Sequence, residues 1–486
     1  MHCAPYILLM LRKTKIVATL GPASSDPATL ARMIEAGVDV VRMNFSHGTA
    51  KEHAERVANV KSIAKNLGRT VGILVDLQGP KIRIGKFKDG KVALQVGDKF
   101  VLDAKCAMGN QDRVGLDYKE LPNDVKPDDI LLLDDGRIEM HVTAVKGEQV
   151  HCVVFRGGVL SNNKGINRKG GGLTAPALTE KDIADIQTAA DLQCDFLAVS
   201  FPRSGADMWK ARDLMREAGG KAMLIAKIER AEAIEALDEI LDASDAIMVA
   251  RGDLAVEVGD AVVPALQKRM IRAARLKNKA VITATQMMES MINSPVPTRA
   301  EVSDVANAAI DGTDAVMLSA ETAAGQFPVE AVEAMVRVLI EAEKEKLDVL
   351  DRRALAHADS TSVEGAIAHA AIFTANHLPV RAIAALTHSG KTALLMSRMN
   401  ADVPIYALSP SIETRRKVTL FRGVYPIRFK HSTVDPEEIM NLAQEDLLKR
   451  GAVNTGDLLV LTIGEPIGKP GGTNTMKIIK VSEHVS

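Results

Sequence analysis

The sequence of 486 residues has few aromatic side chains and almost no net charge. Phe, Trp and Tyr make up 3% of it, so Ala, Val, Ile and Leu must fill the core, as is typical of helices packed on parallel sheets. A formal net charge of −1 gives none of the basic footprint expected for binding to nucleic acid or an anionic membrane. The length exceeds one compact core and predicts about two to four domains.

Cysteine is scarce, and long apolar runs are missing. The four cysteines lack the Cys-x-x-Cys spacing of a zinc site. The apolar run at 7–11 is too short to span a bilayer and has neither a basic segment before it nor a small-residue cleavage site after it. We therefore expect a cytoplasmic protein, with Met10 as an alternative start. Free thiols are expected at Cys3, Cys106, Cys152 and Cys194.

Short β-branched segments alternate with longer amphipathic stretches along most of the chain. One predicted helix follows Ser25 or Asp26, has Pro27 in its first turn and closes at Gly37. Eight strand-helix units predict a (β/α)8 TIM barrel, and an open doubly wound α/β sheet is the alternative. The predicted strands are 15–21, 38–46, 70–79, 194–201, 222–229, 246–253, 280–287 and 314–321.

Two regions depart from this rhythm. Segments over 86–171 alternate apolar and polar residues between Gly- and Asp-rich turns, which predicts a small all-β domain inserted after the third strand. After about residue 350 a further strand and helix pattern predicts a C-terminal α/β domain with its own parallel sheet. The predicted division is 11–85 with 172–348 for the barrel, 86–171 for the inserted lid and 349–486 for the C-terminal domain.

Polar side chains collect at the C-terminal ends of the predicted strands, where barrel enzymes place their chemistry. Such groups cost stability unless they are satisfied, so their enrichment at one end is informative. A ring of structural salt bridges is the alternative interpretation. The set comprises Arg42, Asn44, Ser46, His47, Asp76, Lys81, Arg83, Lys227, Glu229, Arg251, Gly252, Asp253, Thr283, Thr285, Gln286, Ser319 and Glu321.

Two carboxylates in this set predict a metal site. Glu229 and Asp253 follow neighbouring strands and suit Mg²⁺, which prefers one or two carboxylates completed by water and substrate oxygens. Lys227 precedes Glu229 by two residues, so both face the same side of an extended strand. Lys227, Arg42 and Arg83 would neutralise a phosphorylated anion, which is most of what phosphoryl transfer requires.

Seven motifs spread in order over about residues 12–480 resemble the pyruvate kinase family. They are RMNFSHG, DLQGPKIR, LIAKIERAEAI, VARGDL, TATQMMESM, PTRAEVSDVANAAIDGTDAVMLSAET and GGTNTMK. The third fits the family's signature around its catalytic lysine. The resemblance implies transfer of the phosphoryl group of phosphoenolpyruvate to ADP, followed by protonation of the enolate to pyruvate. This is the last step of glycolysis, and the inserted domain would be the family's lid.

The resemblance also implies roles for matching residues. Arg42 would grip the phosphoryl group, Lys227 would stabilise charge on that group and on the enolate, and Glu229 and Asp253 would hold Mg²⁺ or Mn²⁺. The substrate carboxylate would meet the backbone of Gly252 and Asp253 and the hydroxyl of Thr285, which would join a proton relay through water. The nucleotide-side positions are Asn44, His47, Arg83 and Lys164.

Two positions depart from the family pattern. Ala255 replaces the Gly of RGDLG, which we expect to cause only a small local adjustment if its φ is negative. Lys81 stands where potassium-dependent members have Glu, so it resembles a potassium-independent subgroup whose tethered ammonium takes the ion's part. A solvated turn residue is the alternative. The family's monovalent-cation site matches Asn44, Ser46, Asp76 and the backbone of Leu77.

A loop in the C-terminal domain matches the family's effector phosphate loop. It precedes a predicted helix, whose N-terminal N–H groups favour an anion, although ordinary helix capping would explain it as well. The loop residues are Thr387, His388, Ser389, Gly390, Lys391 and Thr392. The Gly-rich segment 464–475 resembles the loop that folds over the effector, and AMP or a sugar monophosphate is the expected effector of a homotetramer.

Two other functions remain open from the residues alone. A barrel lyase or aldolase using Mg²⁺ and a pyruvate enolate would employ the same carboxylates and arginine. A metabolite-sensing protein that has lost catalysis is the third hypothesis, disfavoured because the expected reactive residues are all present.

Overall fold

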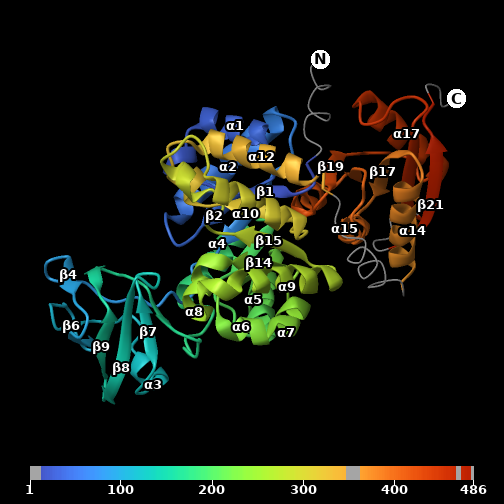
Figure 1. Cartoon of the computed structure of the whole chain (residues 1–486). Helices are drawn as coiled ribbons and strands as arrows, with labels where there is room; N and C mark the ends of the chain where they lie inside the picture. The colour runs from blue at the N-terminus through green and yellow to red at the C-terminus, as the bar shows by residue number, and fades with distance from the viewer. Residues whose placement is uncertain (1–11, 346–361, 467–471, 483–486) are drawn as a thin grey trace.

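The structure is a computed structural model that describes residues 12–345, 362–466 and 472–482 (Figure 1). Cys3, the alternative start at Met10 and part of the predicted 464–475 loop lie outside these residues. Cys106, Cys152 and Cys194 are free, as predicted. Among the helices of the described ranges, none is long and apolar enough to cross a membrane.

Eight parallel strands close into a barrel in the order β1-β16-β15-β14-β13-β12-β3-β2, which confirms the predicted barrel and excludes the open sheet. Their residues are buried towards both the barrel interior and the helices, which explains the continuous apolar runs. The strands are β1 (Lys15–Thr19), β2 (Val40–Asn44), β3 (Gly72–Asp76), β12 (Phe196–Val199), β13 (Met223–Ile228), β14 (Ala246–Ala250), β15 (Ala280–Ala284) and β16 (Ala315–Leu318).

Helices cover the outside of the barrel. The first begins as predicted, because the Asp26 carboxylate accepts the N–H of Thr29 at 2.9 Å, Pro27 opens the helix and Gly37 ends it with a φ of 136°. The helices are α1 (Pro27–Ala36), α2 (Ala50–Asn66), α4 (Glu180–Asp191), α5 (Gly205–Glu217), α6 (Ala231–Glu235), α7 (Leu237–Ala243), α8 (Arg251–Val258), α9 (Val263–Leu276), α10 (Arg299–Ile310), α11 (Ala320–Ala323) and α12 (Pro328–Ala342).

The strands end earlier than the sequence pattern predicted. The predicted strand 246–253 stops at Ala250, and Arg251 begins α8. The predicted strand 314–321 stops at Leu318, and Ala320 begins α11. In both places the polar residues leave the ladder and turn outward, so the reactive side chains stand on loops and helix starts above the barrel.

The inserted segment forms the predicted small β domain, with one short helix added. Along β8, Ile138, Met140 and Val142 are buried while the residues between them are not, which is the alternation expected of a half-buried strand. A six-stranded sheet has the order β11-β7-β8-β9-β5-β6, and β10 pairs with β4. The elements are β4 (Lys91–Leu94), β5 (Lys99–Asp103), β6 (Arg113–Val114), α3 (Leu121–Asp124), β7 (Ile130–Leu133), β8 (Ile138–Lys146), β9 (Gln149–Arg156), β10 (Gly158–Ser161) and β11 (Ile166–Arg168).

The C-terminal domain is an α/β unit with a sheet of order β19-β18-β17-β20-β21. Four strands are parallel, as predicted, but β21 is antiparallel to β20, so the prediction of an all-parallel sheet is wrong at this edge. The elements are α14 (Val363–His377), β17 (Val380–Leu386), α15 (Lys391–Arg398), β18 (Ile405–Ser409), α16 (Ile412–Lys417), β19 (Val424–Arg428), α17 (Pro436–Lys449), β20 (Leu458–Gly464) and β21 (Thr473–Lys480).

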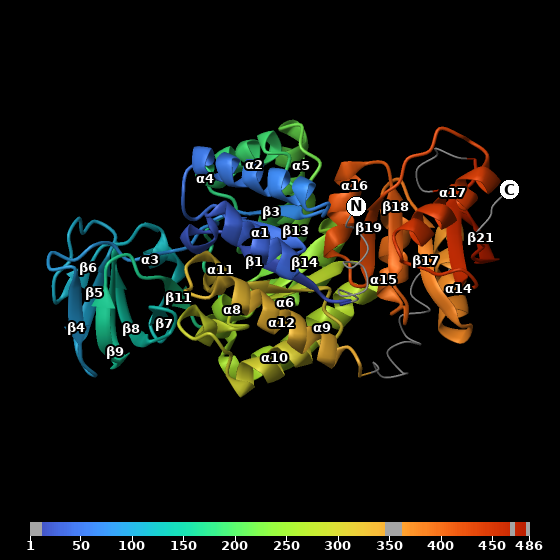
Figure 2. The ribbon, with the colours of Figure 1, turned by 90° about the horizontal axis from the view of Figure 1, so that it is seen from above.

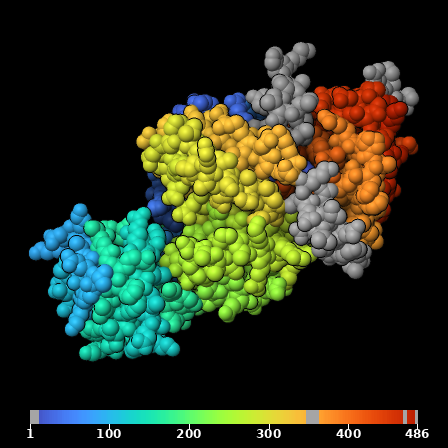
Figure 3. Space-filling view, viewed as in Figure 1, coloured from blue at the N-terminus to red at the C-terminus, as the bar shows by residue number. Residues whose placement is uncertain are grey.

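The lid and the C-terminal domain lie on opposite sides of the barrel (Figures 2 and 3). Arg398, the last residue of α15, reaches the barrel end opposite the reactive strand ends, where its Nη1 donates to Asp314 Oδ2 at 2.7 Å. Both side chains are almost fully buried, and Asp314 also accepts the backbone N–H of Arg422 at 3.0 Å. This ion pair joins the two domains.

Arg398→Met should destabilise the protein strongly, because the Asp314 carboxylate would stay buried without its main partner. We expect the free energy of unfolding to fall by about 3–5 kcal/mol in denaturant titrations. The control is Lys449→Met, which removes an exposed contact to Glu445 and should cost less than about 1 kcal/mol. Equal effects of the two changes would contradict the assigned role of the pair.

Candidate functional site

The carboxylate of Asp76, the last residue of β3, is 1% exposed and lies between two cations. Nε of Arg42, from β2, lies 2.6 Å from Oδ2, and Nζ of Lys227, from β13, lies 3.2 Å from Oδ1. Burial alone would raise the pKa of Asp76, but Lys227 and Arg42 hold it below its usual value. The barrel therefore brings together charges that stand far apart in the sequence.

The ammonium of Lys227 has three acceptors around it. Nζ lies 2.7 Å from Ser200 Oγ, 2.9 Å from Glu229 Oε1 and 3.2 Å from Asp76 Oδ1. Burial alone would lower the pKa of Lys227, but the carboxylates of Asp76 and Glu229 raise it above its usual value. The lysine is thus held as a charged, fully bonded ammonium at the barrel mouth.

The two predicted metal-binding carboxylates face the same region. Glu229 is almost fully buried, and burial, opposed by Lys227 and reinforced by Asp253, raises its pKa to about 7. Asp253 lies in the first turn of α8 and not in a strand, and its Oδ1 is 3.6 Å from Nζ of Lys81. Each carboxylate is therefore paired with a lysine.

This donor set fits Mg²⁺ without enclosing it. Within the described residues no group of three or more His, Cys, Asp or Glu side chains could hold a metal ion. Two carboxylates are nonetheless enough for Mg²⁺, since water and substrate phosphate oxygens complete its six positions. A softer metal, which favours His or Cys, finds no matching ligands in this pair.

Thr285 is held in a strained turn after β15. Its φ is 69° and that of Gln286 is 55°, left-handed values that side chains beyond glycine rarely adopt. The hydroxyl of Thr285 accepts the backbone N–H of Gly252 at 2.9 Å. Arg251 stabilises this turn, because its Nη2 donates to the Thr285 carbonyl oxygen at 2.6 Å. Gly252 and Thr285 thus meet as the motifs predicted.

Three of the groups matching the monovalent-cation site, those of Asn44, Asp76 and Leu77, have partners within the protein. Asn44 Oδ1 accepts the N–H of Ser46 at 3.1 Å, and the Leu77 carbonyl oxygen accepts the Ser200 hydroxyl at 2.7 Å. Asp76 is neutralised by its two cations. The ammonium of Lys81 pairs instead with the carboxylate of Asp253.

Two of the residues predicted on the nucleotide side, Arg83 and Lys164, lie where the inserted domain joins the barrel. The backbone of Arg83 forms an isolated antiparallel β-bridge with Gly165, and its Nη1 donates to the Asn163 carbonyl oxygen at 3.2 Å. Nζ of Lys164 lies 2.6 Å from Asp134 Oδ1. His47 follows β2, and its carbonyl oxygen contacts Nε2 of His53 at 2.9 Å. Arg83 and Lys164 are brought to one seam, whereas His47 stands on the barrel rim.

A cleft of about 710 Å³ separates the lid from the barrel mouth. On the barrel side it is lined by Lys81, Gly252, Asp253 and Ala255. Ala255 lies within helix α8, and its φ is not positive. On the lid side it is lined by residues that sequence reasoning did not single out. They include Glu139, Arg156 and Lys169.

Ser200 was also missed. It follows β12 in the run AVSF, which reads only as the end of an apolar strand, and a serine there carries no motif. The only available signal was its position, since a polar residue directly after a barrel strand belongs with the other strand ends.

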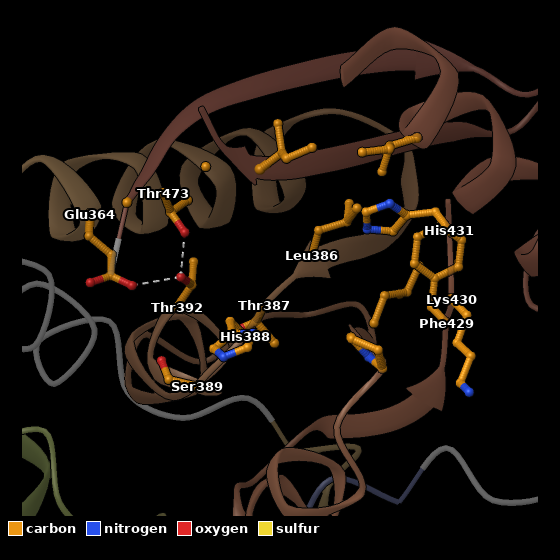
Figure 4. Close-up of a pocket in the computed structure, with 16 residues that line it drawn as sticks. Glu364, Leu386, Thr387, His388, Ser389, Thr392, Phe429, Lys430, His431 and Thr473 are labelled. Carbon is orange, nitrogen blue, oxygen red and sulfur yellow. Dashed lines mark hydrogen bonds between the residues drawn. The ribbon is translucent and has the colours of Figure 1, made fainter. Parts of the chain in front are cut away.

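The predicted effector loop lines a cavity of about 420 Å³ in the C-terminal domain (Figure 4). Thr387, His388, Ser389 and Thr392 face it, and the Thr392 hydroxyl donates to Glu364 at 2.8 Å. Gly390 adopts a φ of 86° and turns the loop into α15. Nζ of Lys391 instead lies 3.1 Å from Glu364 Oε2, and neither Gly390 nor Lys391 lines the cavity as described.

The opposite wall of this cavity comes from a segment that carried no signal in the sequence. Phe429, Lys430 and His431 follow β19, and Figure 4 places them across from the loop. Leu386 and Leu408 add apolar surface between the two walls. The cavity therefore combines a polar loop, an apolar floor and the ionisable side chains of Glu364, Lys430 and His431.

Comparisons with known proteins agree over the whole chain. A family model described as "Pyruvate kinase, barrel domain" matches residues 11–332, and one described as "Pyruvate kinase, alpha/beta domain" matches 365–479. "Pyruvate kinase II" of Salmonella typhimurium is 54% identical over 481 residues, 97% of this chain and 99% of that relative. "Pyruvate kinase" of Haemophilus influenzae is 55% identical, over 93% of this chain and 96% of its own length. The crystal structure of a pyruvate kinase from Cryptosporidium parvum matches with a TM-score of 0.92 at 33% identity, covering 99% of this chain and 98% of that one.

Gly79→Ala should lower the free energy of unfolding more than the same substitution at an exposed glycine with a similar φ. Gly79 has a φ of 66°, and a Cβ there would lie 2.7 Å from Ser200 Cβ and 3.0 Å from the Phe201 ring. The control Gly68→Ala has a φ of 64° and meets nothing within 4 Å. We expect a loss of about 1–2 kcal/mol for the control and a further 1–3 kcal/mol for Gly79→Ala in denaturant titrations. Equal losses would mean that Gly79 does not pack against Ser200.

Proposed function

The chain belongs to the pyruvate kinase family, and we propose that it transfers the phosphoryl group of phosphoenolpyruvate to ADP, giving pyruvate and ATP. The observation that carries the proposal is the charged ammonium of Lys227 at the barrel mouth, 3.2 Å from Asp76 and beside Arg42. Phosphoryl transfer depends mainly on positioning and on stabilising negative charge, and this group supplies fixed positive charge where water is largely excluded.

The residues divide the work by charge. Arg42 would grip the phosphoryl oxygens, and Lys227 would stabilise charge on the transferred group and then on the enolate oxygen. The backbone N–H groups at Gly252 and Asp253 open helix α8, which suits the substrate carboxylate. The Thr285 hydroxyl, 2.9 Å from the Gly252 nitrogen, would complete that carboxylate site.

Glu229 and Asp253 would hold Mg²⁺, or Mn²⁺ in its place. The ion supplies charge neutralisation between substrate and nucleotide phosphates when it is bound. Each carboxylate now faces a lysine, Glu229 with Lys227 at 2.9 Å and Asp253 with Lys81 at 3.6 Å. Both lysines would be free to contact phosphate oxygens once their carboxylates bind the metal.

Protonation of the enolate needs a donor near Thr285. A threonine hydroxyl is a poor acid, so we propose that Thr285 acts through a water molecule. Its strained turn, held by Arg251, keeps the hydroxyl in place during the step.

The nucleotide would bind between barrel and lid. We assign Asn44, His47, Arg83 and Lys164 to this side. None of the four lines the cleft of about 710 Å³, whose walls include Lys81 and Asp253 from the barrel and Arg156 and Lys169 from the lid. Closure of the lid over the nucleotide would exclude water, which otherwise competes with ADP for the phosphoryl group.

Regulation would come from the cavity of the C-terminal domain. We propose that AMP or a sugar monophosphate binds there with its phosphate at the loop from Thr387 to Thr392, next to the N-terminus of α15. Lys430 would add positive charge, and the floor around Leu386 would receive the apolar part of the effector.

The assembly and location follow the family expectation. We propose a homotetramer in the cytoplasm, with domains 11–85 with 172–348, 86–171 and 349–486. On α14, Val363 is 66% exposed and Phe373 is 57% exposed, and contact with another copy would cover this apolar face.

Family membership speaks against the two alternative functions. An aldolase or lyase would need neither the lid nor Lys164, and both are in place. A sensor without catalysis would not be expected to retain the buried set of Arg42, Asp76, Lys227 and Glu229.

Lys227→Met should abolish turnover because it removes the positive charge, while the chain stays folded, although less stable, since Arg42 still pairs with Asp76. We expect kcat to fall by at least about 10²–10³-fold in an assay that couples pyruvate formation to phosphoenolpyruvate and ADP. Circular dichroism should stay unchanged, and Lys449→Met, on the outer surface, serves as the matched control. Retained turnover in Lys227→Met would contradict the proposed mechanism.

Full turnover should not require potassium, because the ammonium of Lys81 supplies the positive charge. In buffer with tetramethylammonium as the only monovalent cation, the unaltered chain should keep nearly all of its rate. Lys81→Glu should lose about tenfold or more there and regain rate when K⁺ is added. Collapse of the unaltered chain without K⁺, with recovery on adding it, would refute this role.

A further inference from the structure

Ser200 makes two short hydrogen bonds at the barrel mouth. It follows β12 directly and is 1% exposed. Its hydroxyl donates to the Leu77 carbonyl oxygen at 2.7 Å, and its Oγ lies 2.7 Å from Nζ of Lys227. A hydroxyl carries one proton, so the oxygen is left to accept from the ammonium. Ser200 is therefore oriented as an acceptor for Lys227.

Lys227 has three N–H donors and three protein acceptors. They are Asp76, Glu229 and Ser200, and together they use every donor of the ammonium. An ammonium bonded in this way has none left for a substrate. One of the three contacts must open before Lys227 can reach a phosphoryl or enolate oxygen.

Glu229 is the acceptor that can leave. Under the proposed function its carboxylate binds the metal ion, whereas Asp76 stays bound to Arg42 at 2.6 Å and Ser200 stays bound to the Leu77 carbonyl oxygen. Asp76 and Ser200 would then hold two of the three N–H groups. A lysine side chain has many rotamers when it is free. A second fixed contact restricts these rotamers and so determines the direction of the third N–H.

Ser200 itself is firmly placed. Gly79 approaches so closely that a Cβ there would lie 2.7 Å from Ser200 Cβ. The next residue, Phe201, has a φ of 54°, and its N–H donates to Glu229 Oε2 at 2.9 Å. The guanidinium of Arg230 lies 5.4 Å from the Phe201 ring centroid. One strained turn thus contacts both Lys227 and Glu229.

We propose that Ser200 is a positioning residue that holds the Lys227 ammonium on one side, so that the N–H released by Glu229 is directed at the substrate. The inference rests on the proposed function, since it assigns the substrate to Lys227. Ser200 itself touches no substrate in this account. It acts only through the lysine.

Ser200→Ala should lower kcat by about 10–100-fold, the usual cost of losing a group that orients a reactive side chain. The KM for phosphoenolpyruvate should change by less than about threefold, because Arg42, Gly252 and Thr285 remain in place. Ser200→Thr keeps the hydroxyl and should recover most of kcat. Ser200→Cys keeps the size but offers a weak acceptor, so it should resemble the alanine variant.

Ser244→Ala is the matched control. Ser244 is also 1% exposed, its hydroxyl has no hydrogen-bond partner, and it lies before β14 at the opposite end of the barrel. This variant should keep full kcat. Mn²⁺ binding, followed by the paramagnetic resonance of the free ion, should be unchanged within about twofold in Ser200→Ala, because Glu229 and Asp253 are intact.

Several results would overturn the inference. They are a kcat of Ser200→Ala within twofold of the unaltered chain, a loss shared by Ser244→Ala, a loss that Thr does not restore, or a parallel loss of Mn²⁺ binding. If Ser200→Ala does not fold, the contrast between Thr and Cys decides. An inactive unaltered chain would refute the proposed function and this inference together. An active chain with an inactive Lys227→Met and a fully active Ser200→Ala would refute only the role of Ser200.

Discussion

The mutual neutralisation of Asp76, Arg42 and Lys227 is the interaction on which the barrel mouth depends. A carboxylate that is 1% exposed can stay ionised only if cations compensate it, and here two cations do so at 2.6 and 3.2 Å. That demand fixes the two cationic side chains, and Lys227 also contacts Glu229 and Ser200. Removing any one charge would leave the others buried and unbalanced. The same group concentrates positive charge where a transferred phosphoryl group needs it.

The barrel makes this arrangement possible through its register. Asn44 of β2 lies opposite Asp76 of β3, so the side chains that follow both strands emerge at one level. The short helix α8, which follows β14, presents Gly252 and Asp253 at the same end of the barrel. At the other end, Arg398 joins α15 to Asp314 before β16. Helix α15 begins at the loop that lines the C-terminal cavity and ends at the barrel, on the side opposite the mouth.

The sequence predicted the eight-stranded barrel, the inserted lid and the strand-end cluster because each rests on local signals, namely apolar periodicity, turn residues and motifs. It extended the strands too far, since the polar residues after the apolar run 246–250 were included in the predicted strand, although the backbone turns into α8 at Arg251. The antiparallel β21 was missed as well, because the direction of an edge strand depends on which edge of the sheet is left unpaired. Ser200, Phe429 and His431 were missed for another reason. They matter through neighbours distant in the chain, and no spacing rule marks such residues.

Phosphorus NMR of the unaltered chain tests the central claim most directly. Phosphoenolpyruvate, ADP and Mg²⁺ would be mixed with the purified protein, and each would be omitted in turn. If Lys227 and Arg42 transfer a phosphoryl group at the barrel mouth, the phosphoenolpyruvate signal should disappear as the γ-phosphate of ATP grows in equal amount. Every omission should stop the change, and no inorganic phosphate should accumulate. Release of inorganic phosphate without ATP, or consumption of phosphoenolpyruvate in the absence of ADP, would contradict the account.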